Sequence, residues 1–210
     1  MSAAAQRLEV LPGGRDAPDD AVGDTDWLDP TAADSCAESM SSPWDPEHQL
    51  VGALMWLPAT TVQRIAAVVP SSAIERPITR WAYEIIAGVA AAGDNPDPVL
   101  VLATAKRQPC SIGPDPGAAP SATRHHQLSV YLARAYTETV SADNAPSYGR
   151  EVLDGAYRRA FAASGQRMQA LAETGADRAE LTDQFAAVRE ELLDWWRRAE
   201  AAAQPGWADR

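Results

Sequence analysis

The sequence is poor in positive charge. Its 210 residues include 18 lysines and arginines against 29 aspartates and glutamates, which gives a formal net charge of −11. DNA and anionic membranes both attract clustered cations, so this balance argues against binding to either through bulk charge. Only one basic residue is a lysine, Lys106, and no glycine-rich phosphate-binding loop accompanies it. The sequence therefore excludes a P-loop ATPase.

Cysteine and long apolar runs are also scarce. The two cysteines, Cys36 and Cys110, form neither a disulfide framework nor a Cys-x-x-Cys metal motif, and we expect free thiols in a reducing compartment. No apolar run approaches the roughly 18–20 residues of a membrane span. The N-terminus lacks the basic start and apolar core of a signal peptide. These features predict a cytoplasmic protein without membrane segments.

The histidines do not indicate a metal or catalytic site. His48, His125 and His126 fit no HExxH pattern, and the ExxH pattern of di-iron helical bundles is absent. Nothing singles out a Ser/His/Asp arrangement. We therefore expect no enzymatic activity, no metal and no cofactor.

Negative charge is concentrated at the start of the chain. Residues 1–45 hold two arginines and ten aspartates or glutamates, a net charge of −8. Large apolar residues are rare there, so burial cannot offset the entropy lost on ordering. We predict a disordered acidic tail over 1–43. An alternative is a short docking peptide over 24–29, where Trp27 and Leu28 lie among acidic residues.

The strongest helical pattern runs from Ile74 to Gly93. Its apolar stripe recurs at helical spacing and consists of Ile78, Trp81, Ala82, Ile85, Ile86, Val89 and Ala90. Pro77 suits the first turn of a helix, and Gly93 suits its left-handed end. A helix with one such face needs other helices to cover it.

Four shorter helices are expected around this one within residues 44–140. The first begins after the predicted N-cap Asp45 and stops before Pro58, and the second spans Ala59–Val69. The third, after Asp97-Pro98, contains a VLVLA run that also suits a buried strand, but no second strand-like run exists to pair with it. The fourth spans about Thr123 to Thr139, after a Pro- and Gly-rich loop over 109–121.

Residues 141–203 predict two long helices packed as an antiparallel hairpin, followed by a tail over 204–210. One helix runs from Ala145 to Thr174, and the other from the capping-box pattern Asp177-x-x-Glu180 to about Ala202. The apolar positions of the second helix alternate by four and three residues, as in a coiled-coil seam; they are Leu181, Phe185, Val188, Leu192, Trp195 and Ala199. A looser matching seam on the first helix is Leu153, Tyr157, Ala160, Ser164, Met168 and Leu171. The predicted fold class is all-α: a compact five-helix globule followed by a long antiparallel helical hairpin.

One seam buries only one face of each arm, so further large side chains remain for a partner. Trp195 and Trp196 cannot both point inward, and exposed aromatic residues typically mark an interaction surface. We expect an inner seam of Leu181, Phe185, Val188 and Leu192. Candidates for contact with a second copy are Tyr157, Phe161, Trp195 and Trp196. A charge in the seam is expected to unfold the hairpin, whereas a charge at Trp196 should remove only the partner.

Two arginine pairs leave a second interpretation open. Arg158-Arg159 and Arg197-Arg198 could contact phosphates, which would make the protein a small helical nucleic-acid-binding regulator. Such pairs more often form solvated faces and ion pairs within a helix.

Five segments occur in an order that resembles the N-terminal domain of bacterial replicative DNA helicases of the DnaB type. Residues 46–54, PEHQLVGAL, resemble its opening helix, in which an acidic residue and Gln precede a short apolar helix with a central Gly. Residues 74–77, IERP, resemble the start of its aromatic–x–arginine–proline helix, with Ile74 in the usual aromatic place. The other three segments are 93–102, 128–133 and 141–159.

The resemblance covers roughly residues 46–175 and implies both a fold and a role. In that family the domain is all-α, and its hairpin pairs with a neighbour's to build a collar on the hexameric ring. The collar also receives the C-terminal domain of the DnaG-type primase. The resemblance thus implies a replication accessory protein that contacts a replicative helicase motor or a primase. It also implies a homodimer or higher oligomer formed through the hairpin, with nucleic acid contacted only indirectly.

Overall fold

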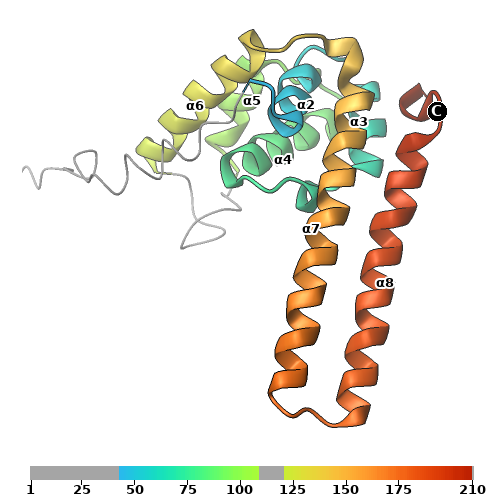
Figure 1. Cartoon of the computed structure of the whole chain (residues 1–210). Helices are drawn as coiled ribbons and strands as arrows, with labels where there is room; N and C mark the ends of the chain where they lie inside the picture. Colours follow the sequence, from blue (N-terminus) through green and yellow to red (C-terminus); the bar gives the residue numbers. More distant parts are fainter. Residues whose placement is uncertain (1–42, 109–120, 210) are drawn as a thin grey trace, which may run out of the picture. The chain divides into compact units, whose positions relative to one another are not determined.

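The structure, a computed structural model, describes residues 43–108 and 121–209. These ranges contain seven α-helices and no strand, which confirms the all-α class for the described part of the chain (Figure 1). The predicted acidic tail, the candidate docking peptide over 24–29, both cysteines and nearly all of the loop over 109–121 lie outside the described residues.

The helices begin and end close to where the sequence pattern places them. Five come first: α2 (Pro46–Leu54), α3 (Ala59–Val68), α4 (Pro77–Ala91), α5 (Pro98–Ala105) and α6 (Ala122–Thr137). Two longer ones follow, α7 (Ala145–Glu173) and α8 (Arg178–Ala203). Three short 3-10 turns, η2 (Ser71–Ala73), η3 (Ala142–Asn144) and η4 (Trp207–Asp209), complete the described elements.

Three predicted helix starts are confirmed by their capping hydrogen bonds. The Asp45 carboxylate accepts the backbone N–H of Glu47 at 3.1 Å, and the Asp97 carboxylate accepts that of Val99 at 2.8 Å. At the start of α8, Asp177 and Glu180 form the reciprocal capping box, at 2.9 and 3.2 Å. The VLVLA run lies in α5, so the helix interpretation of that run is correct.

The central helix, α4, begins at Pro77 rather than Ile74. Arg76 has the extended ψ of 128°, because the ring of a following proline disfavours the helical region. Ile74 is nevertheless fully buried, so it belongs to the core although it lies outside the helix. At the other end, Gly93 has a φ of +93°, as expected for a left-handed helix stop.

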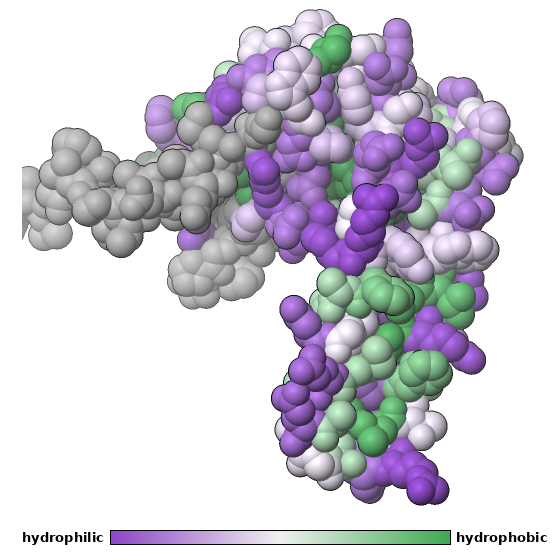
Figure 2. All heavy atoms as spheres, viewed as in Figure 1, coloured by the Kyte–Doolittle hydropathy of each residue, from purple (hydrophilic) through white to green (hydrophobic). Residues whose placement is uncertain are grey.

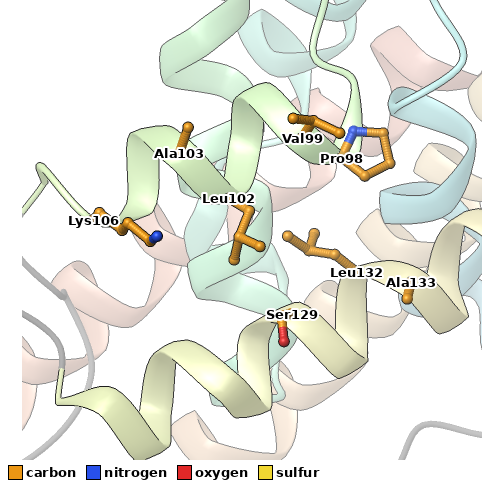
Figure 3. A pocket seen from close by; sticks show the side chains of 8 residues that line it. All are labelled: Pro98, Val99, Leu102, Ala103, Lys106, Ser129, Leu132 and Ala133. Atoms are coloured by element: carbon orange, nitrogen blue, oxygen red, sulfur yellow. The ribbon is translucent and has the colours of Figure 1, made fainter.

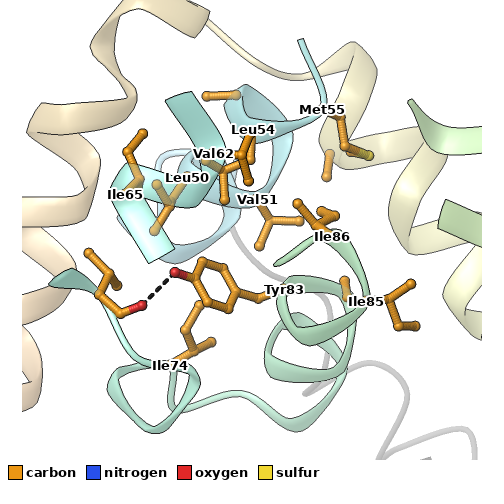
Figure 4. Packing of buried hydrophobic residues seen from close by; sticks show 14 of the residues in the cluster. Leu50, Val51, Leu54, Met55, Val62, Ile65, Ile74, Tyr83, Ile85 and Ile86 are labelled. Atoms are coloured by element: carbon orange, nitrogen blue, oxygen red, sulfur yellow. Dashed lines mark hydrogen bonds between the residues drawn. The ribbon is translucent and has the colours of Figure 1, made fainter. Parts of the chain in front are cut away.

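The core lies between α4 and the helices around it. Figure 4 shows apolar side chains of α2, α3 and α4 converging, among them Leu50, Ile65 and Ile86. Tyr83 is buried with them, and its hydroxyl donates to the carbonyl of Val69 at 2.5 Å. Burial raises the pKa of that hydroxyl, so it stays protonated and keeps the hydrogen bond.

Helix α2 packs against α6 at a point that requires a glycine. A Cβ placed on Gly52 would lie 2.1 Å from Oγ1 of Thr139 and 2.2 Å from the backbone oxygen of Ala135. No side chain fits there, so the central glycine of the first resemblance segment sets the distance between these helices. Next to it, Gln49 donates to the carbonyls of Pro43 and Glu138 and accepts the N–H of Val140.

A buried carboxylate joins α2, α7 and the segment before α4. Glu47 accepts the backbone N–H groups of Glu75 at 2.9 Å and Arg76 at 3.4 Å, and Nη2 of Arg159 on α7 at 3.4 Å. The same Arg159 nitrogen donates to the carbonyl of Ala73 at 2.5 Å. Burial raises the pKa of Glu47, and its hydrogen bonds to the two backbone N–H groups and the charge of Arg159 oppose that shift.

The last described residues, 207–209, form an ordered turn. The sequence predicts only a tail over 204–210, but η4 forms there, and Ala208 is buried. The ring of Trp207 lies beside α7 at Gly149, where an added Cβ would be only 3.4 Å from the ring. The half-buried Trp207 packs against the core from this added turn, which no periodic pattern predicts.

Candidate protein-interaction surface

Large apolar side chains are exposed on α7 and α8. Phe161 is 61% exposed, Phe185 60% and Trp196 49%. Figure 2 shows apolar residues gathered over this helix pair, in contrast to the more hydrophilic surface elsewhere in the view. Single exposed apolar residues are ordinary, whereas three exposed aromatic side chains on one helix pair make it the candidate interaction surface.

These side chains border one shallow hollow, which we call the α7–α8 groove. Its volume is about 560 Å³, and it is lined by Tyr157, Phe161, Met168, Phe185, Val188, Arg189, Leu192, Leu193 and Trp196. One of these nine residues carries a charge, Arg189. The groove is therefore an apolar strip suited to receive the side chains of another helix.

The α7–α8 groove brings together six of the eight residues predicted for the partner interface. Trp195 and Leu181 are the two that do not line it. Trp195 is half-buried and packs against the core, which leaves Trp196 as the exposed member of the pair. The expectation that the two tryptophans point in different directions is confirmed.

The predicted inner seam is only partly correct. Val188 is buried and Leu192 is half-buried, whereas Leu181 is 39% exposed and Phe185 is 60% exposed. Gln184 and Glu191, each one residue before a predicted seam position, are half-buried instead, so the seam is shifted by one residue at these points. A charge at Leu181 or Phe185 is thus not expected to unfold the helix pair.

A polar contact joins the two helices near the predicted apolar seam. The Arg167 guanidinium forms an ion pair with Glu191 across the two helices and donates to the hydroxyl of the buried Ser164 at 3.0 Å. Of the apolar side chains of α8, Leu181 and Phe185 are exposed, whereas Val188 is buried. The apolar spacing in the sequence did not predict this ion pair, because it follows the large apolar residues and takes no account of the polar ones.

Sequence reasoning also missed three residues that line the groove: Met168, Arg189 and Leu193. Met168 has the spacing of the α7 seam, so it was assigned to the inside. Leu193 follows Leu192 directly, and adjacent residues of a helix point about 100° apart, so such a pair indicates a wide apolar face. That signal could have been used.

The four candidate arginines do not form one surface. Arg159 contacts Glu47, Glu75 and the Ala73 carbonyl, and Arg198 contacts Asp194 at 2.9 Å and the carbonyl of Val68. Their guanidinium groups are thus engaged in contacts within the chain. Arg158 and Arg197 are exposed. A phosphate contact would therefore use one arginine of each pair rather than both.

The described residues also contain no group of three or more His, Cys, Asp or Glu side chains placed to hold a metal ion. In the same part of the chain, no helix is both long and apolar enough to cross a membrane. No protein family model, no curated protein and no solved structure matches this chain.

Proposed function

We propose that this chain is a non-enzymatic accessory protein of DNA replication that acts through helix-on-helix contacts. In this proposal the described helices form a domain like the collar of DnaB-type helicases, with α7 and α8 as its antiparallel hairpin. The face of α7 and α8 that carries the groove packs against the same face of a second copy. The resulting assembly contacts a replicative helicase motor or a primase.

The observation that carries the proposal is the exposure of Phe161, Phe185 and Trp196 beside a groove of about 560 Å³. Aromatic side chains are the residues that most often dominate the affinity of a protein interface. On the same helix pair Val188 is buried and Arg167 pairs with Glu191, whereas the three aromatic side chains stay largely exposed. These aromatic residues are thus available to a partner.

The contacts of Glu47 join three of the segments that carry the resemblance. Glu47 lies in the first segment, accepts N–H groups from the second, over 74–77, and pairs with Arg159 of the last. Gly52, the central glycine of the first segment, sits where no side chain fits. Residues that resemble a family motif are therefore the ones on which this packing depends, which supports a collar-like arrangement.

The test of the partner is direct binding to two purified proteins, a replicative helicase motor and a DnaG-type primase, by surface plasmon resonance. We expect saturable binding to at least one of them, and loss of about tenfold or more in affinity for Trp196→Glu. Trp44→Glu is the matched control, because Trp44 is 79% exposed and lies outside the groove. No binding to either protein, or equal loss in both variants, would refute the assignment.

Nucleic-acid binding is the second candidate, since Arg158 and Arg197 are exposed. It predicts salt-dependent retention of DNA that falls in the Arg158→Ala/Arg197→Ala double variant. Absence of retention at low salt eliminates it.

A further inference from the structure

A second hollow lies between α5 and α6, on helices that take no part in the α7–α8 groove. Its volume is about 400 Å³, and its lining includes Val99, Leu102, Lys106, Ser129, Leu132 and Ala133. Figure 3 shows Leu102 of α5 and Leu132 of α6 pointing toward one another across it. Val99 at one end is 79% exposed, so a large apolar side chain there faces solvent.

The two helices that form this hollow carry charge of one sign. Residues 98–108 and 121–137 contain Lys106, Arg107, Arg124 and Arg134 but no aspartate or glutamate, although the whole chain has a net charge of −11. Arg134 pairs with Glu138, which follows α6, and Asp97 caps the opposite end of α5. The exposed Lys106 and Arg107 place positive charge where α5 ends, and Lys106 borders the hollow there.

We propose that this α5–α6 groove binds a short amphipathic helix of an acidic partner protein. Its apolar side chains would pack on Val99, Leu102 and Ala133, and its carboxylates would lie at the end of α5 marked by the exposed Lys106 and Arg107. The eight residues of α5 span about 12 Å at 1.5 Å per residue, so the contacting part has two to three turns.

The lining favours a peptide over a nucleic acid. Single-stranded nucleic acids bind by stacking bases on aromatic side chains, and none lines this groove. A helix fits better than a strand, because the described residues offer no sheet edge to extend. The charge complementarity then selects acidic partner segments over basic ones.

The experiment measures fluorescence anisotropy of a labelled helical peptide titrated with the full chain. The probe has about 16 residues, with leucines at i, i+4 and i+7 and glutamates on the flanks. We expect a Kd on the order of 10–100 μM that weakens as salt is added. Val99→Glu and Lys106→Glu should each weaken binding about tenfold, and circular dichroism should show unchanged helix content.

Two controls match these changes outside the groove. Val140→Glu places a glutamate at another exposed valine, and Arg64→Glu makes the same change in net charge on α3. Both should bind the probe as the unaltered chain does, and Trp196→Glu should do so too, which separates this proposal from the α7–α8 assignment. Equal binding of a peptide with lysines in place of the glutamates would overturn the proposal. So would no saturation by about 1 mM, or tighter binding of single-stranded DNA that the groove variants abolish.

Discussion

Glu47 and Glu75 contact the same guanidinium, that of Arg159, each at 3.4 Å, but from different environments. The side chain of Glu47 is 8% exposed and also accepts two backbone N–H groups, whereas that of Glu75 is 65% exposed. Solvent screens the second ion pair, so the contribution of these carboxylates should differ widely.

Glu47→Ala should therefore lower the free energy of unfolding by about 2–4 kcal/mol, because it leaves two backbone N–H groups and the Arg159 guanidinium without this acceptor. Glu75→Ala should lower it by less than about 1 kcal/mol. Urea denaturation followed by circular dichroism measures both. Similar values for the two variants would mean that the buried contacts do not hold the three segments together.

His48 supplies a second prediction at this scale. Its ring is buried, with Nε2 3.1 Å from Oε2 of Glu138 and its plane edge-on to Tyr131. Burial lowers the pKa of His48 below 6.5, and Glu138 only partly opposes the shift. The unfolded chain thus takes up this proton more readily. The stability that His48 contributes is fully present above pH 6.5, the pKa in the unfolded chain. It is lost as the pH falls from 6.5 through the lower pKa of the folded protein.

Glu47 acts in the opposite sense, because its pKa is raised in the folded protein. Its contribution to stability falls as the pH rises from 4.5, the pKa in the unfolded chain, through the raised pKa. Comparison with His48→Gln separates the two groups, because Glu47 is present in both proteins. Between pH 7 and 5 the unaltered chain should lose more stability than His48→Gln. Parallel pH profiles from denaturant titrations would rule out this role of His48.

At the scale of helices, most of the fold could be predicted because the signals are local. Caps such as Asp45, Asp97 and Asp177 lie within three residues of the N–H groups they accept, and apolar stripes repeat every three or four residues. The Glu47–Arg159 contact joins residues 112 positions apart and has no such signal. The shift of the α8 seam was missed for a similar reason, since the polar partners Arg167 and Glu191 lie on different helices.

The approach of α2 to α6 gives the sharpest prediction for an element. Gly52→Ala places a methyl group against the backbone oxygen of Ala135, which cannot move without shifting α6. We expect a loss of about 2 kcal/mol or more. Gly165→Ala, within α7 where nothing lies within 4 Å, should instead gain about 0.5–1 kcal/mol. Thermal denaturation of both variants checks the pair; a tolerated Gly52→Ala would contradict the close packing.

At the scale of the whole molecule, the proposals use two separate surfaces. The α7–α8 groove is apolar with exposed aromatic residues, and the α5–α6 groove is apolar with a basic end. A second copy suits the first and an acidic helix the second, so one chain could join a self-assembled collar to a further protein. The sequence predicted six of the residues that line the first surface. The sequence did not predict the α5–α6 groove. Its lining comes from two helices separated in the sequence by residues 109–121, so no local pattern of residues indicates it.

Self-association through the α7–α8 groove is the central claim, and sedimentation equilibrium over a range of protein concentrations tests it most directly. The unaltered chain should shift from the mass of the 22.4 kDa monomer to a dimer or larger assembly as concentration rises. Trp196→Glu should remain a folded monomer, and Trp44→Glu should assemble normally. A chain that stays monomeric at all concentrations, or a Trp196→Glu variant that assembles as well as the unaltered chain, would contradict the account.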